Sequence, residues 1–227
     1  MQQIALDIGL SPAPTLDNFF PGPNATALAH MRQWSPIGAA PTYLWGPEGS
    51  GKTHLLQGLR SRLHQQGHAT GYLGAQDAPP MGAAPDLLFD DSWSAVFMDD
   101  VHAYPPALQQ TAFSWFVQAQ ALGLPVLAAG RLAPVALPLR EDLRTRLGWG
   151  HVLGLQLLDE AQSRAVLRQM ADARGLVLSE EVMDFTLRRF SRDLGSLMQL
   201  LDGLDRYALQ TQRALTIPLV KSMLENA

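Results

Sequence analysis

The feature that most constrains this chain is a glycine-rich stretch at residues 46–53, which reads Gly-Pro-Glu-Gly-Ser-Gly-Lys-Thr and matches G-x-x-x-x-G-K-[ST] at every fixed position. The glycines let backbone N–H groups turn inward around phosphate oxygens, and the helix that follows such a loop presents its positive N-terminus to the same anion. Lys52 is expected to reach the β- and γ-phosphates, and the Thr53 hydroxyl to help hold Mg²⁺. The stretch therefore predicts a site for ADP or ATP with Mg²⁺, formed by Gly46, Pro47, Glu48, Gly49, Ser50, Gly51, Lys52 and Thr53.

The residues around this loop predict an α/β fold. Thr42–Trp45 is a candidate buried strand that ends at the loop, and leucines recur at helical spacing from Leu55 to Leu63 after it. Further apolar runs predict strands over 69–73, 95–98, 125–129 and 152–157. Short strands that alternate with helical patterns are typical of a parallel sheet covered by helices.

Strand signals stop after about residue 157, where helical patterns take over. Four helices are expected there. The first has a capping box at Asp159 and Gln162 and ends near Gly175, and the second is capped by Ser179. The third carries an apolar stripe at Leu194, Leu197, Leu201, Leu204 and Ala208, and the fourth begins at about Pro218. The predicted organisation is a flexible tail over 1–14, a nucleotide-binding α/β domain over 15–157 and a small helical domain over 158–227.

A second chemical signal is the apolar run at 95–98, which ends in Asp99 and Asp100. An apolar strand that ends in an acid supports the magnesium shell of P-loop NTPases. Asp99 would orient the metal, and Asp100 would position or polarise the attacking water. Acids at a strand end also serve as turn caps, so both interpretations stay open.

Composition excludes several classes of function. The 227 residues carry 17 Lys+Arg against 21 Asp+Glu, with lysine only at positions 52 and 221, which argues against a protein whose main task is to grip nucleic acid. The absence of cysteine excludes disulfides, thiolate nucleophiles and cysteine-bound metals. The first ten residues do not resemble a signal peptide, and no apolar run approaches 18 residues. A cytoplasmic protein without a membrane or sequence-specific DNA partner is expected.

Three segments resemble the DnaA-like AAA+ family. Residues 15–24 look like the adenine-side segment that opens the AAA+ module of bacterial DnaA initiators, which implies that Phe19, Pro21 and Asn24 contribute to nucleotide binding. Residues 142–150 resemble the arginine-finger box of the family, with Arg146 at the finger position. The helical region is similar to the AAA+ lid, so the resemblance implies a P-loop AAA+ parallel-sheet body followed by an all-helical lid.

The shortened organisation resembles the Hda family of DnaA regulatory inactivators. The chain ends at Ala227, where an initiator would continue into a DNA-binding domain, and residues 3–8 resemble the peptide with which that family docks on the DNA polymerase sliding clamp (beta subunit). In such a peptide an extended segment places alternate apolar side chains in a pocket. The implied clamp contacts are Gln3, Ile4, Leu6 and Ile8. The residues alone also fit a frayed terminus or an edge strand.

The resemblance implies a regulator rather than an enzyme. The nucleotide-bound protein would use Arg146 in trans to stimulate ATP hydrolysis by DnaA and so prevent over-initiation of replication, while weak ATPase activity of its own stays open. A finger arginine contributes about 10³–10⁵ in rate in other NTPases. Alternatives are an internal ion pair for Arg146, a stand-alone P-loop ATPase of helicase-loader type, and an adaptor that docks on another replication protein. A homodimer is also compatible with the sequence.

Two positions depart from the family pattern. Gly130, followed by Arg131, stands where a polar sensor is expected, and Gly195 stands where the lid usually supplies an arginine, with Arg192 nearby. Glycine has no side chain with which to contact a γ-phosphate. Efficient hydrolysis by this chain itself is therefore not expected, whereas the intact loop predicts that nucleotide binding is retained.

Overall fold

The computed structural model describes residues 13–78, 87–189, 197, 200–206 and 216–225. The chain divides into two compact units, one over Pro14–Gln156 and one from Leu157 onward. The predicted clamp residues Gln3, Ile4, Leu6 and Ile8 lie outside the described residues, as do Arg192, Leu194, Gly195 and Ala208.

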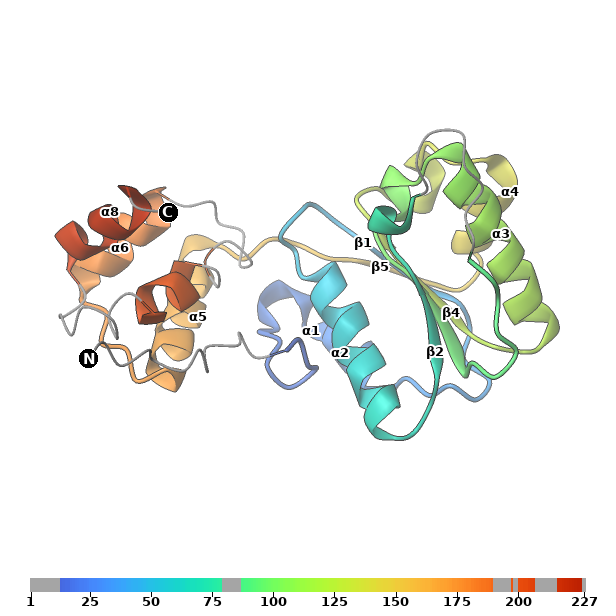
Figure 1. Cartoon of the computed structure of the whole chain (residues 1–227), viewed down its shortest axis with the longest axis horizontal. Helices are drawn as coiled ribbons and strands as arrows, with labels where there is room; N and C mark the ends of the chain where they lie inside the picture. The colour runs from blue at the N-terminus through green and yellow to red at the C-terminus, as the bar shows by residue number, and fades with distance from the viewer. Residues whose placement is uncertain (1–12, 79–86, 190–196, 198–199, 207–215, 226–227) are drawn as a thin grey trace, which may run out of the picture. The chain divides into compact units, whose positions relative to one another are not determined.

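The first unit is built on a five-stranded parallel sheet with the order β2-β3-β4-β1-β5 (Figure 1). The strands are β1 (Thr42–Trp45), β2 (Thr70–Leu73), β3 (Ala95–Met98), β4 (Val126–Gly130) and β5 (His151–Gly154). The prediction of an α/β fold is confirmed, and four of the predicted strands agree with the observed ones to within one residue at either end.

The prediction of a last strand over 152–157 is wrong at its end, because β5 stops at Gly154. The N–H of Leu155 still donates to the Trp45 carbonyl (2.7 Å), which is the last bond of the β1–β5 ladder. The next residue leaves the sheet, since both backbone groups of Gln156 are bonded to the side chain of Asn24.

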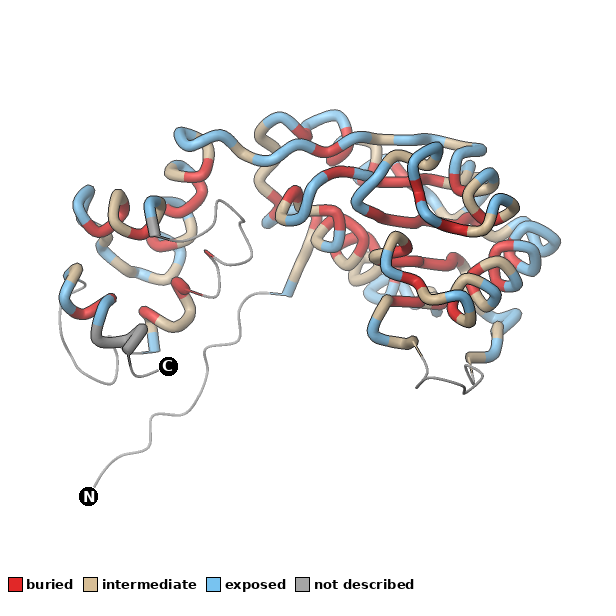
Figure 2. The backbone as a smooth tube through the Cα atoms, turned by 90° about the horizontal axis from the view of Figure 1, so that it is seen from above, coloured by how far each residue is buried: buried red, intermediate tan, exposed pale blue. Residues whose placement is uncertain are grey.

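Helices cover both faces of the sheet (Figure 1). On one face, α1 (Ala25–Gln33) and α2 (Lys52–Gln65) pack on Leu127 and Ala129 of β4. On the other face, α3 (Pro106–Ala121) and α4 (Glu141–Leu147) pack on the alternate residues Val126 and Ala128. All four residues of β3 and all five residues of β4 are buried. Figure 2 shows such continuous buried stretches inside the first unit. Short 3-10 turns lie at Gly22–Asn24, Ala75–Asp77, Val101–Ala103 and Pro134–Ala136.

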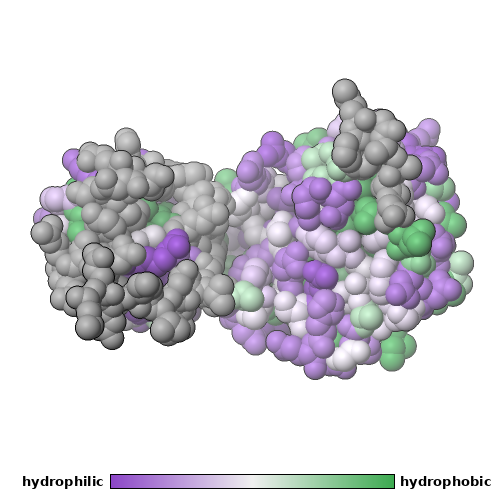
Figure 3. Space-filling view, in the orientation of Figure 1, coloured by the Kyte–Doolittle hydropathy of each residue, from purple (hydrophilic) through white to green (hydrophobic). Residues whose placement is uncertain are grey.

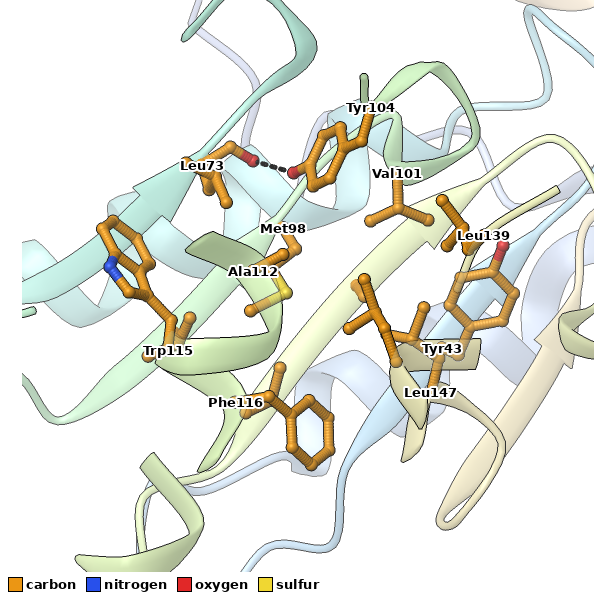
Figure 4. Close-up of a cluster of buried hydrophobic side chains, with 14 of the residues drawn as sticks. Tyr43, Leu73, Met98, Val101, Tyr104, Ala112, Trp115, Phe116, Leu139 and Leu147 are labelled. Carbon is orange, nitrogen blue, oxygen red and sulfur yellow. Dashed lines mark hydrogen bonds between the residues drawn. The ribbon is translucent and has the colours of Figure 1, made fainter. Parts of the chain in front are cut away.

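The core on the α3 side contains two buried tyrosines (Figure 4). The Tyr104 hydroxyl donates to the Leu73 carbonyl (2.6 Å), and the Tyr43 hydroxyl donates to the Leu132 carbonyl (2.7 Å). Burial raises the pKa of both phenols well above the usual range, so both stay protonated donors. The Tyr104 hydroxyl thus joins the end of β2 to the segment after β3, and the Tyr43 hydroxyl joins β1 to the segment after β4.

The second unit is helical, as predicted. It contains α5 (Glu160–Ala173), α6 (Glu180–Arg189), helical residues 200–206 and α8 (Ile217–Glu225), which begins one residue before Pro218. The capping box between Asp159 and Gln162 is confirmed, and the Ser179 hydroxyl accepts from the N–H of Val182 (3.3 Å). The core of this second unit is formed by Leu167, Ala171, Val182, Met183, Leu200, Leu201, Leu204 and Val220.

The visible face of the first unit is mostly hydrophilic, with hydrophobic residues scattered over it (Figure 3). Within the described part of the chain, no helix combines the length and the apolar character that a membrane crossing needs.

Candidate functional site

The glycine-rich loop joins the end of β1 to the start of α2, and its shape requires glycine at two positions at least. A Cβ on Gly46 would overlap the Leu155 carbonyl oxygen. Gly51 has φ +92°, and a Cβ there would lie 2.6 Å from the ring of Phe19. Only glycine combines the left-handed backbone with the missing side chain, so these residues hold the loop close against its neighbours.

Lys52 is a buried ammonium at the base of the loop, with 6% of its surface exposed. Its Nζ donates to the Pro47 carbonyl (2.8 Å) and lies 3.5 Å from the Ser50 hydroxyl. Both of these acceptors are neutral. Among the described residues, no carboxylate forms an ion pair with Lys52. Burial lowers the pKa of Lys52, while the charges of Asp100 and Asp99 act in the opposite direction. A buried cation with neutral partners suits an anionic ligand, so the residues present fit a phosphate group.

The two acids that follow β3 have different surroundings. Asp99 is buried and accepts hydrogen bonds from the Tyr72 hydroxyl (3.1 Å) and the N–H of Asp100 (3.0 Å), and the Thr53 side chain lies near enough to lower its pKa. Burial, followed by the neighbouring charge of Asp100, raises the pKa of Asp99. The structure thus brings together the two residues that were predicted to hold the metal, Thr53 and Asp99. Tyr72 is a neighbour that sequence reasoning missed, because nothing near position 72 marks it as a partner of position 99.

Asp100 has a left-handed backbone (φ 52°), the only positive φ of a non-glycine residue in the part of the chain that the structure describes. Such a conformation costs an L-residue about 1–2 kcal/mol. Its carboxylate forms no cap hydrogen bond with the 3-10 turn that follows, and half of its side-chain surface is exposed, 3.9 Å from His102. The side chain of Asp100 therefore does not cap the turn, and that interpretation of Asp100 is wrong. Strained backbone of this kind is concentrated at functional sites.

The rim of the loop carries an ion pair that sequence reasoning also missed. The Arg131 guanidinium, which follows β4, lies 2.5 Å from the Glu48 carboxylate of the loop (Nη2 to Oε2). The Arg131 N–H donates to Nδ1 of His102 (3.3 Å). The only signal in the sequence was an arginine directly after the glycine at the expected sensor position.

The segment before α1 contacts both the loop and the end of β5. Phe19 is buried against Gly51, and its ring meets the ring of His54 edge-on with centroids 5.4 Å apart. The Asn24 amide donates to the Gln156 carbonyl (2.9 Å) and accepts from the Gln156 N–H (2.8 Å). Pro21 precedes the 3-10 turn, and its carbonyl accepts from the N–H of Asn24 (2.6 Å). Phe19 is therefore placed at the loop, while Asn24 is engaged with the backbone beyond β5.

Arg146 lies on α4 in contact with residues of α3, α4 and the following turn. Its guanidinium stacks over the rings of Phe113 (4.8 Å to the centroid) and Trp149 (5.2 Å), and Nη1 donates to the Asp142 carbonyl (3.0 Å). The Asp142 carboxylate is held by Arg140 through two bonds of 2.6 and 2.7 Å. Within the described residues Arg146 has no ion-pair partner, so the internal ion pair considered for it belongs to Arg140.

Trp149, which follows α4, packs within the domain only in part. Its ring meets Phe116 edge-on (6.4 Å between centroids), but 52% of its surface is exposed.

Among the described residues, no group of three or more His, Asp and Glu side chains is arranged to hold a metal ion.

Comparisons with known proteins agree with this arrangement. Residues 159–224 match the family model described as Hda, lid domain. An uncharacterised protein of Haemophilus influenzae is 32% identical over 234 residues, which cover 98% of both chains. Domain III of the replication initiation protein DnaA of Thermotoga maritima has a TM-score of 0.76 at 22% identity, over 95% of this chain and 97% of that one. AMPPCP-bound DnaA of Aquifex aeolicus has a TM-score of 0.70 at 22% identity, over 95% of this chain and 70% of that one. At these identities the structural likeness establishes the fold.

Proposed function

Because the chain belongs to the Hda-like family of DnaA-related AAA+ proteins, we propose that it restrains replication initiation as a nucleotide-bound adaptor, which docks on the sliding clamp and stimulates ATP hydrolysis by DnaA through Arg146. The observation that carries this proposal is the surroundings of Arg146. Its stacking and hydrogen-bond partners come from α3, α4 and the turn after α4, and none comes from the glycine-rich loop. A guanidinium placed in this way acts on another molecule.

The stack on Phe113 and Trp149 prepares Arg146 for such a role. Stacking holds the plane of the guanidinium while its single bond to the Asp142 carbonyl leaves other N–H donors free. Because Arg140 neutralises the nearby carboxylate, the charge of Arg146 stays available. A planar cation of this kind stabilises the charge that spreads over a transferring phosphoryl group.

The adaptor binds a nucleotide of its own, ADP or ATP, at the glycine-rich loop. The loop N–H groups and Lys52 would hold the phosphates, Phe19 would support the base side, and Thr53 with Asp99 would hold Mg²⁺. When bound, the metal–nucleotide complex supplies positive charge beside Asp99 and negative charge beside Lys52. Gly130 offers no polar side chain at the sensor position, which supports a regulator that binds nucleotide and leaves hydrolysis to its partner.

The tail supplies the tether to the clamp. Gln3 would hydrogen-bond beside a pocket that takes Ile4, Leu6 and Ile8. Docking on clamps that have been loaded on DNA raises the local concentration of the adaptor near DnaA, so the contact between the two proteins need not be tight.

A reconstituted hydrolysis assay tests the proposal. Radiolabelled ATP–DnaA is incubated with DNA-loaded clamp, ADP and this protein, and the ADP formed on DnaA is measured. Wild type is expected to convert DnaA in a clamp-dependent way, and Arg146→Ala to reduce conversion to the level without the protein. Arg144→Ala, which removes a neighbouring arginine of the same helix, is the matched control and is expected to behave as wild type.

Three outcomes would contradict parts of the proposal. Full conversion by Arg146→Ala would remove the finger assignment. Full conversion by a Gln3→Ala, Leu6→Ala variant would remove the clamp contact and favour an adaptor docked elsewhere. No conversion by a folded, nucleotide-bound wild type would overturn the adaptor function.

A stand-alone P-loop ATPase of helicase-loader type is the second candidate, and one contact favours it. Thr53 lies near Asp99 and lowers its pKa, and the strained Asp100 follows directly, which is the arrangement that a hydrolysing site needs. Steady turnover of ATP without DnaA or clamp, lost in Asp100→Asn, would support this candidate over the adaptor.

A further inference from the structure

Tyr72 lies on β2, beside the strand β3 that Asp99 follows, and its hydroxyl contacts that acid. The hydroxyl donates to Oδ2 of Asp99 at 3.1 Å, between residues 27 positions apart in the sequence. A tyrosine hydroxyl is protonated at neutral pH, so it is a donor to the carboxylate. Tyr72 therefore occupies one of the two oxygens of the residue that is proposed to hold the metal.

Two backbone bonds fix the rest of Asp99. Its own N–H donates to the Leu73 carbonyl at 2.8 Å, which ties its backbone to the end of β2. The N–H of Asp100 donates to Oδ1 at 3.0 Å. A carboxylate with a donor on each oxygen and a fixed backbone has one preferred orientation. Of these three bonds, the bond from Tyr72 is the one that a side-chain substitution removes.

The ring of Tyr72 is supported from α2. The Arg60 guanidinium lies over this ring, 4.9 Å from its centroid, and Arg60 Nε donates to the Thr70 hydroxyl at 3.3 Å. The ring also packs on the buried apolar cluster that the leucines of α2 share with β4. Thr53 lies in the first turn of the same helix. The hydroxyl that contacts Asp99 is therefore held between β2 and the helix that carries the second proposed metal ligand.

The charge of Asp99 is left without a cationic partner. Among the described residues Asp99 forms no ion pair, although it lies close enough to Lys52 for its charge to act on the pKa of that ammonium. Lys52 bonds instead to neutral acceptors of the loop. Neutral donors stabilise a buried carboxylate, and a bound cation compensates its charge. The carboxylate is thus oriented by hydrogen bonds while its charge stays available to a metal ion.

We propose that Tyr72 is a positioning residue of the nucleotide site, whose hydroxyl orients the Asp99 carboxylate for Mg²⁺. The inference rests on the proposed nucleotide site and adds a residue that acts on the metal through Asp99. Removing a side chain that hydrogen-bonds a metal ligand typically lowers metal affinity by about 10–100-fold. The loss of a single hydroxyl at position 72 should therefore be measurable as weaker metal binding.

Calorimetric titration of ADP in Mg²⁺ and in EDTA tests the inference. The readout is the ratio of the dissociation constant in EDTA to that in Mg²⁺, which measures how far the metal tightens nucleotide binding. Wild type is expected to have a ratio above one, and Asp99→Asn a ratio near one. Tyr72→Phe keeps the ring beneath Arg60 and is expected to lower the ratio about tenfold, or to one where the wild-type ratio is smaller than that. Its dissociation constant in EDTA is expected to stay at the wild-type value.

Tyr104→Phe is the matched control. It also removes one tyrosine hydroxyl at this end of the sheet, but that hydroxyl donates to the Leu73 carbonyl and not to the acid (Figure 4). Its ratio is expected to equal that of wild type. A second readout is the paramagnetic resonance of Mn²⁺, which takes the same oxygen ligands as Mg²⁺. Tyr72→Phe should raise the Mn²⁺ concentration for half occupancy of the ADP complex by about tenfold, and Tyr104→Phe should not.

Three results would contradict the inference. A wild-type ratio in Tyr72→Phe, together with a lowered ratio in Asp99→Asn, would overturn it and leave the metal site standing. Equal falls in Tyr72→Phe and Tyr104→Phe would overturn it as well, because the ratio would then follow the packing of β2 in general. A ratio of one in a folded wild type that binds ADP would overturn the proposed metal site and the inference together.

Discussion

The glycine-rich loop and the Arg146 helix are held in place by different means. The loop is a contiguous segment whose glycines lie against Leu155 and Phe19 and whose lysine is buried. Arg146 is partly exposed and is positioned by aromatic rings from α3 and from the turn after α4. The loop is therefore anchored in the core through its buried residues Gly46, Ser50 and Lys52, whereas the arginine is a surface group supported by aromatic rings. Changes in the loop should affect folding and nucleotide binding together, and changes around Arg146 should affect action on a partner without affecting nucleotide binding.

The largest expected effect follows from Gly46→Ala. The new methyl group would overlap the Leu155 carbonyl, so we expect a loss of about 2–4 kcal/mol in the free energy of unfolding, together with loss of nucleotide binding. Gly67→Ala is the control, because a Cβ there meets open space at φ +84° and costs about 1 kcal/mol. Denaturant unfolding of both variants gives the comparison. Equal losses would show that contact with Leu155 does not constrain the loop.

The next effect comes from restoring a polar sensor with Gly130→Asn. Because Tyr43 occupies the space, we expect a loss of about 1–3 kcal/mol in the free energy of unfolding. Tyr43→Phe in the same chain removes the hydroxyl and should recover part of that loss, since its ring carbon Cζ lies 3.3 Å from the Cβ position. A double-mutant cycle measures the coupling. Additive losses would contradict the direct overlap.

A smaller effect is expected from Phe113→Leu on the Arg146 side. The ring lies under the guanidiniums of both Arg140 and Arg146, and a cation–π contact at a partly exposed site contributes about 0.5–1 kcal/mol. We expect a modest fall in stability, a several-fold fall in the ATP hydrolysis by DnaA that this protein stimulates, and unchanged nucleotide affinity. A parallel fall in nucleotide affinity would remove the distinction between the two regions.

The smallest effect separates the two regions by pH. His54, next to Thr53, is bonded through Nε2 to the Thr15 carbonyl and the Asn18 side chain, and burial lowers its pKa from 6.5. The unfolded chain then takes up the proton first, so the stability contributed by neutral His54 is complete above pH 6.5 and decreases as the pH falls towards the folded pKa. His54→Gln, which keeps a donor, should flatten this part of the stability profile.

On the Arg146 side, the same measurement should show a loss only in stronger acid. Hydrogen bonds from Arg140 lower the pKa of Asp142 from 3.8. The stability contributed by this carboxylate is therefore present above pH 3.8 and decreases as the pH falls through the folded pKa. Asp142→Asn should remove that decrease and leave the profile near pH 6 unchanged. A change near pH 6 in this variant would contradict the assignment to Asp142.

Prediction from the sequence succeeded where a feature depends on neighbouring residues. The loop, its strand and its helix follow from residues 42–65, and the capping box at Asp159 follows from a spacing of three residues. Prediction failed at residues 155–157, because whether an apolar run continues as a strand depends on a partner strand. There the side chain of Asn24 bonds the backbone in place of a strand.

The sequence by itself determined the α/β class, the phosphate-binding shape of the loop and the helical second unit, because backbone freedom, capping and periodicity are local properties. Only the tertiary structure decided which residues meet around the site. The Tyr43 hydroxyl closes the space at Gly130 through a bond to a residue 89 positions away, and Asn24 holds a backbone 132 positions away. Arg140, and not Arg146, takes the Asp142 carboxylate. Such pairings depend on how separate elements pack, and no local pattern distinguishes one acceptor from another of the same chemistry.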